Sequence, residues 1–134
     1  MKRVACVASA LAILVLAAGA DDATTPSIKE VMTKLHKGAN APLSKLKTAL
    51  KAESPDWTSI RISTAQVTVL GASLPKNAPP KGEKADYERR ARAYLANAKD
   101  LNAAAKAEDK AQAQAALDKL GASCKDCHSA HKGK

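Results

Sequence analysis

The sequence predicts an all-α protein, an antiparallel four-helix bundle, on three observations. Four segments repeat apolar residues every three or four positions, the connections between them are short, and alanine is frequent at the repeating positions. A period near 3.6 places the apolar residues on one face of a helix. Short connections make successive helices antiparallel neighbours, and small side chains let those helices approach one another closely.

The first segment, residues 26–52, carries an apolar stripe across a proline. Ser27 and Glu30 have the spacing of a capping box at its start. Pro42 removes a backbone donor and should kink or break the helix. Because the apolar phase continues across Pro42, we expect one bent helix over residues 26–52 in preference to two separate helices.

Three further helices are expected along the chain. The second spans residues 55–74, and residues 75–82 form a loop because they are rich in Pro, Asn and Gly. The third spans residues 83–106, and the fourth begins near Glu108. The apolar stripe of the fourth helix consists of Ala113, Leu117, Leu120, Cys124, Cys127 and His131.

The first twenty residues have the features of a secretory signal. Lys2 and Arg3 precede an apolar stretch at residues 4–16, and small residues follow at 18–20. We expect cleavage after Ala20, which leaves one domain over residues 21–134 in the periplasm or outside the cell. A retained membrane anchor is the alternative, but residues 4–20 fall short of the roughly 20 residues that a spanning helix needs.

The composition leaves a thin core and a basic surface. The chain has no Phe, one Trp (Trp57) and two Tyr (Tyr87 and Tyr94). Alanine buries little area, so we expect another group to fill part of the interior. The formal net charge is +9, but nucleic-acid binding is not favoured because no aromatic or Arg-rich segment for nucleic-acid recognition stands out.

The sequence Cys124-Lys-Asp-Cys127-His128 has the C-x-x-C-H pattern of covalent haem c attachment. On a helix the two cysteines lie about one turn apart and face the same way, next to the histidine. Cys124 and Cys127 are therefore predicted to tether one haem, with His128 as the proximal iron ligand. Three alternatives are a zinc site that adds His131, a thioredoxin-like redox pair, and a structural disulfide in a haem-free helical module.

The segment "ALDKLGASCKDCHSAHK" resembles the last helix of class II c-type cytochromes, the cytochrome c′ family. "VMTKL", followed by "KAESPDW", is similar to the first helix and following turn of that family. The resemblance implies a four-helix bundle with the haem motif near its C-terminus. The family usually carries an aromatic residue and then Arg at the positions held here by His131 and Lys132.

The distal ligand of the iron decides the function that this resemblance implies. Met32 lies about 9 Å into the first helix and His128 roughly 6 Å from the end of the fourth, so antiparallel packing places them nearly level. Met32 is therefore predicted to be the distal ligand, with His36 as the rival and an ordinary core methionine as the alternative. Met ligation corresponds to the low-spin, electron-carrying branch of the family, and an open distal face to five-coordinate proteins that bind nitric oxide or carbon monoxide.

We therefore expect an electron carrier and not an enzyme, because the sequence shows no acid/base pair or substrate pocket. Several lysines fall near the expected haem end, including Lys29, Lys125 and Lys132. They would favour a redox partner with an acidic docking face, although a solvated lysine surface is an alternative reading. Neither nucleic acid nor stable membrane insertion is expected after cleavage, and the chain could be a monomer or a homodimer.

Overall fold

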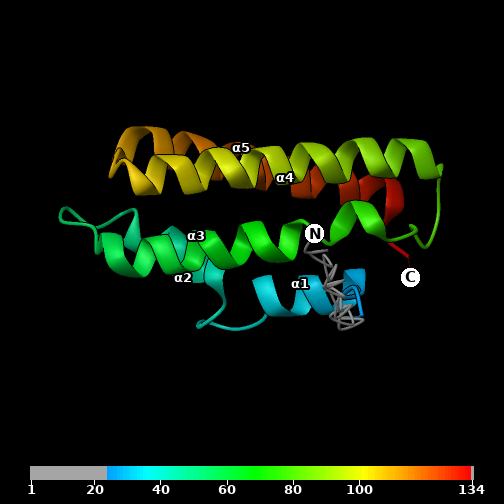
Figure 1. Cartoon of the computed structure of the whole chain (residues 1–134), viewed down its shortest axis with the longest axis horizontal. Coiled ribbons are helices and arrows are strands. Elements are labelled where there is room, and N and C mark those ends of the chain that lie inside the picture. The colour runs from blue at the N-terminus through cyan, green and yellow to red at the C-terminus, as the bar shows by residue number, and fades with distance from the viewer. Residues whose placement is uncertain (1–23, 134) are drawn as a thin grey trace, which may run out of the picture.

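A computed structural model describes residues 24–133, and all regular structure in that range is helical (Figure 1). The prediction of an all-α helical bundle is confirmed. The predicted signal, residues 1–20, lies outside the described residues. The elements are α1 (Ile28–His36), α2 (Pro42–Ala49), α3 (Trp57–Gly71), the 3-10 turn η1 (Leu74–Lys76), α4 (Lys84–Lys106) and α5 (Lys110–His131).

The two longest helices, α4 and α5, lie side by side and form the most extensive packing in the described chain (Figure 1). Helix α3 packs against α4, and α2 packs against α3. Helix α1 packs on α2 and α3, at the end of the bundle that also holds η1. Together α1 and α2 occupy the place expected for the first helix of the bundle.

The prediction of one bent helix over residues 26–52 is wrong, because α1 and α2 are separate helices. Lys37 leaves the helical conformation and Gly38 has a φ of 90°, which only glycine adopts without strain. Ala41 is extended, and Pro42 is the first residue of α2. Proline is favoured at that position because its missing N–H would have no helical partner there.

The predicted capping box at the start of α1 is confirmed. The backbone N–H of Ser27 donates to Glu30 Oε2 at 2.8 Å, and the backbone N–H of Glu30 donates to Ser27 Oγ at 3.3 Å. Asp56 and Asp109 cap α3 and α5 through their side chains, which accept from backbone N–H groups of the first turn. These caps fix where each helix begins.

The core consists mainly of leucine, alanine and two tyrosines. The predicted stripe of α4 is buried throughout, and on α5 Ala113 and Leu120 face it. Gly71 of α3 lies so close to the Tyr94 ring that an added Cβ would be 3.0 Å from Cε1. The buried stripe of α4 consists of Tyr87, Ala91, Tyr94, Ala98, Leu101 and Ala105.

Among the helices of residues 24–133, none has the length and apolar character required to cross a bilayer.

Candidate functional site

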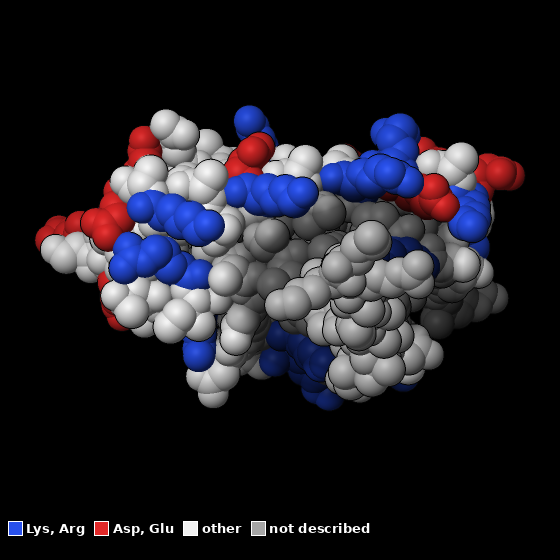
Figure 2. All heavy atoms as spheres, in the orientation of Figure 1, with Lys and Arg blue, Asp and Glu red and all other residues white. Residues whose placement is uncertain are grey.

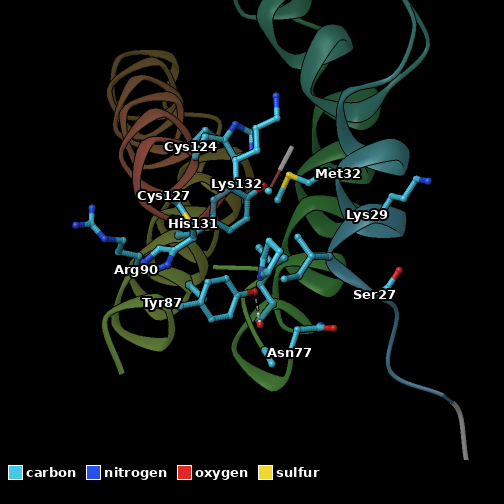
Figure 3. A pocket seen from close by; sticks show the side chains of 18 of the residues that line it. Ser27, Lys29, Met32, Asn77, Tyr87, Arg90, Cys124, Cys127, His131 and Lys132 are labelled. Carbon is cyan, nitrogen blue, oxygen red and sulfur yellow. Dashed lines mark hydrogen bonds between the residues drawn. The ribbon is translucent and has the colours of Figure 1, made fainter. Parts of the chain in front are cut away.

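A cavity of about 810 Å³ lies between α1 on one side and α4 and α5 on the other (Figure 3). Its remaining wall comes from η1 and the loop that follows it, through Leu74, Asn77 and Pro80. This volume is in the range of pockets that hold small molecules and cofactors. The cavity therefore lies at the end of the bundle where α1 and the end of α5 face one another.

Helix α5 contributes the complete C-x-x-C-H motif to this cavity. Cys124 and Cys127 are half-buried in its wall, and neither forms a disulfide. Desolvation raises the pKa of both thiols above the usual range, because burial disfavours the thiolate. His128 also lines the cavity and remains exposed to solvent. Two neutral thiols and one accessible imidazole therefore face the same space.

Helix α1 contributes Met32 from across the cavity. In Figure 3 its sulfur points into the space between α1 and α5, whereas Lys29 points away from it. Met32 is half-buried, and its neighbours Val31 and Leu35 are fully buried against the core. The capping box at Ser27 fixes the start of α1 and so the level of Met32 along the cavity.

His36, one helical turn beyond Met32, also lines the cavity but is exposed. Partial desolvation and the nearby positive charges of His128 and Lys47 lower the pKa of its imidazole. The structure thus brings together all four predicted site residues, Met32, Cys124, Cys127 and His128, with the rival His36 at the edge.

The residues around the cavity fit a large, mainly apolar group. Leu74, Ala91 and the ring of Tyr87 supply apolar walls. The Tyr94 hydroxyl, which also borders the cavity, is buried and has no hydrogen-bond partner within the described part of the chain. Burial raises the pKa of that hydroxyl. A buried polar group is normally paired, so this one is consistent with a cavity shaped around an additional group.

A charged cluster beside the motif was not predicted from the sequence. His131, only 3% exposed, has Nδ1 3.0 Å from the Lys81 carbonyl oxygen and Nε2 2.9 Å from Asp86 Oδ2. Asp86 also accepts hydrogen bonds from Arg89 and from Arg90 Nε, the latter at 2.7 Å. These three donors hold the pKa of the Asp86 carboxyl well below its usual range.

Two alternatives for the cysteines receive no support from the geometry. Within residues 24–133, no group of three or more His, Cys, Asp and Glu side chains is placed to hold a metal ion. The zinc site formed by Cys124, Cys127, His128 and His131 is therefore not assembled, since His131 is turned toward Asp86. The setting is helical throughout the described range, unlike the βαβ setting of a thioredoxin-like pair.

Residues 82–132 match the family model of cytochrome c′. This span contains α4, α5 and the C-x-x-C-H motif, and so the wall of the cavity that carries both cysteines. Comparison with curated proteins and with solved structures found no match. The family implies haem c as the cofactor, and the cavity, the thiols and the imidazole fit that group. The match of residues 82–132 therefore supports a class II c-type cytochrome, of the cytochrome c′ family.

Proposed function

We propose that this protein is an exported one-electron carrier that holds one haem c. Cys124 and Cys127 tether the haem through thioether bonds, and His128 of α5 and Met32 of α1 are the two protein ligands of its iron. When bound, the haem supplies a one-electron redox couple. The observation that carries the proposal is that these four residues, which lie on the first and last helices, border one cavity.

The surroundings of Met32 support its role as the distal ligand. Val31 and Leu35 anchor α1 in the core on both sides of it, so its position is held by packing. Its sulfur points into the cavity, whereas His36 is exposed at the edge. Methionine and histidine are a ligand pair used by electron-carrying c-type cytochromes.

The protein chain also supplies what a carrier needs around its redox centre. The half-buried thiols and the buried rings of Tyr87 and Tyr94 give the interior of the cavity a mainly apolar lining. Lys29 and Lys132 lie at its border, and Figure 2 shows further Lys and Arg side chains along the upper edge of the visible face, where α4 runs. This basic surface suits a redox partner with an acidic docking face, which would make electron transfer slower as ionic strength rises.

The optical spectrum of the haem-loaded protein tests the proposal. We expect a low-spin spectrum with a Met–iron charge-transfer band at the red end of the visible. Met32→Ala should abolish that band and allow rapid binding of carbon monoxide, whereas the control His36→Ala should leave the spectrum unchanged. A five-coordinate wild-type spectrum with rapid carbon monoxide binding would instead assign the protein to the gas-binding branch, and loss of the low-spin state in His36→Ala would identify His36 as the ligand.

Two further measurements test attachment and export. A pyridine haemochrome assay should give one haem per chain, and Cys124→Ala or Cys127→Ala should lower the covalently bound fraction. The mature protein should begin at Asp21. A colourless protein with the mass of the polypeptide alone would refute the proposal.

A further inference from the structure

We propose that Asp86, Arg90 and His131 form a charged clamp that positions the haem-binding turn of α5, with His131 held in it as an imidazolium. The proposal rests on the haem function of the C-x-x-C-H motif and extends it, because it names residues outside the motif that fix its position and tune its redox potential. The set is called the Asp86 clamp below.

The charge of His131 follows from its hydrogen-bond partners. Its Nδ1 lies 3.0 Å from the carbonyl oxygen of Lys81, which can only accept. Its Nε2 lies 2.9 Å from Asp86 Oδ2, and Asp86 is held ionised by two arginines, so this oxygen also only accepts. A neutral imidazole has one donor nitrogen and one acceptor nitrogen. Both nitrogens of His131 must donate, and in this geometry the ring therefore carries a positive charge.

The Asp86 clamp holds α5 on both sides of Cys127 and His128. Arg90, fixed by Asp86, donates from Nη1 to the carbonyl oxygen of Asp126 at 3.3 Å. His131 connects the last turn of α5 to the same carboxylate. Asp126 directly precedes Cys127, and His131 follows His128 by less than one turn. One carboxylate on α4 thus determines how this turn of α5 sits against the cavity.

The loop before α4 is shaped to admit the His131 ring. Gly82 has a φ of 81°, and an added Cβ would lie 2.6 Å from His131 Nδ1. The ring also meets the edge of Tyr87, at a centroid distance of 5.6 Å and an interplanar angle of 82°. His131 is therefore enclosed by α4, α5 and this loop.

The charges that face this cluster leave it positive. Asp86 carries one negative charge and meets three cations, Arg89, Arg90 and His131. A second carboxylate, Asp126 on α5, also acts on Arg90, so two negative charges face three positive ones. The other titratable groups nearby are Tyr87 on α4 and Cys127 on α5, both of which are neutral, with Lys132 following on the chain and Lys29 at the border of the cavity on α1. A positive charge beside the cavity favours the less positive, reduced state of a bound redox centre.

The charge state is tested first, on the wild-type holoprotein. Nitrogen-15 NMR of the histidine side chains in the reduced protein should show one ring with a proton on both nitrogens at pH 7.5, where a free imidazole has lost most of its charge. The same ring should lose this signature in Asp86→Asn. A His131 ring with a single proton in the wild type would overturn the proposal, whatever the haem does.

The effect on the redox potential is tested with two variants, each of which removes one positive charge. His131→Gln removes the buried charge of the clamp. Arg92→Gln removes one exposed charge from α4, the helix that carries Asp86; within residues 24–133, Arg92 pairs only with Glu88, at 3.5 Å. We expect the equilibrium constant for reduction to fall about tenfold in His131→Gln, equivalent to 59 mV for a one-electron couple. Arg92→Gln should change it by less than about threefold, because solvent screens that charge.

Equal potentials in the two variants would overturn the proposal. A pyridine haemochrome assay on the wild type separates this result from failure of the proposed function. If the wild type binds no haem, the function proposed above is wrong, and the NMR measurement still decides whether the Asp86 clamp holds a charged His131. If His131→Gln does not fold, that NMR measurement on the wild type gives the same decision.

Discussion

Replacing Tyr87 by Phe should lower stability at neutral pH and raise it in strong alkali. The Tyr87 hydroxyl donates to the Leu74 carbonyl oxygen at 2.8 Å and connects α4 to η1. That oxygen also accepts from the Asn77 backbone N–H at 3.1 Å, so it keeps one partner in the variant. The cost is therefore that of an ordinary net hydrogen bond, about 1 kcal/mol in the free energy of unfolding at pH 7. The ring contact with His131 is retained by Phe.

At high pH the order of stability of the wild type and Tyr87→Phe reverses. Burial raises the pKa of Tyr87 to about 12, whereas an unfolded tyrosine ionises near pH 10. The stabilisation that comes from keeping the phenol neutral is complete below about pH 10 and is lost as the pH rises toward 12. By pH 12 this loss amounts to about 2 kcal/mol in the wild type and is absent in Tyr87→Phe. The variant should then be the more stable protein, by about 1 kcal/mol.

Urea denaturation followed by far-ultraviolet circular dichroism, from pH 7 to pH 12, measures both effects. Tyr94 has a raised pKa in both proteins, so its contribution cancels in the difference. A variant as stable as the wild type at pH 7 would show that the bond to Leu74 contributes nothing. A difference that stays constant up to pH 12 would show that Tyr87 is not held neutral by burial.

Two further predictions concern the loop before α4 and its partner. Gly82→Ala should destabilise the protein by about 1–3 kcal/mol, because Gly82 has a positive φ and faces His131 at close range. The control Gly121→Ala, in open space within α5, should stabilise the protein by about 0.5–1 kcal/mol. Equal effects of the two substitutions in urea denaturation would show that the positive φ of Gly82 and its approach to His131 do not require glycine. The pKa of Asp86 is lowered in the folded state. The ionised carboxylate of Asp86 therefore stabilises the folded protein above about pH 4, and this stabilisation is lost as the pH falls further. Asp86→Asn should therefore show a smaller acid-induced loss of stability, and an unchanged acid profile would contradict this.

The helical architecture, and the proximity of the candidate site residues around one cavity, could be predicted because both depend on short-range patterns. The spacing of Cys124, Cys127 and His128 is a local motif, and the period of α4 fixed which of its residues are buried. Met32 could be placed beside the motif by helix rise alone, since the cavity is bounded by the start of α1 and the end of α5.

What the sequence did not predict depends on backbone conformation or on contacts between distant residues. The apolar phase of the first segment continues across the break, and the periodicity therefore could not reveal the positive φ of Gly38 that ends α1. The hydrogen bond between His131 and Asp86 joins residues 45 positions apart. No motif in the sequence indicates that these two residues pair, and the spacing of His131 matched the apolar stripe of α5.

Because α1 and α2 are separate helices, one of them packs the bundle and the other positions Met32; a continuous helix would have to do both. Leu43 and Leu46 hold α2 on α3, while the capped start of α1 sets the level of Met32. Gly38 is exposed, with no atom of another residue near the place of its missing side chain. Changes of length at this connection would therefore be absorbed at the surface. The wall of the cavity formed by α1 and the packing of the bundle can thus vary independently during evolution.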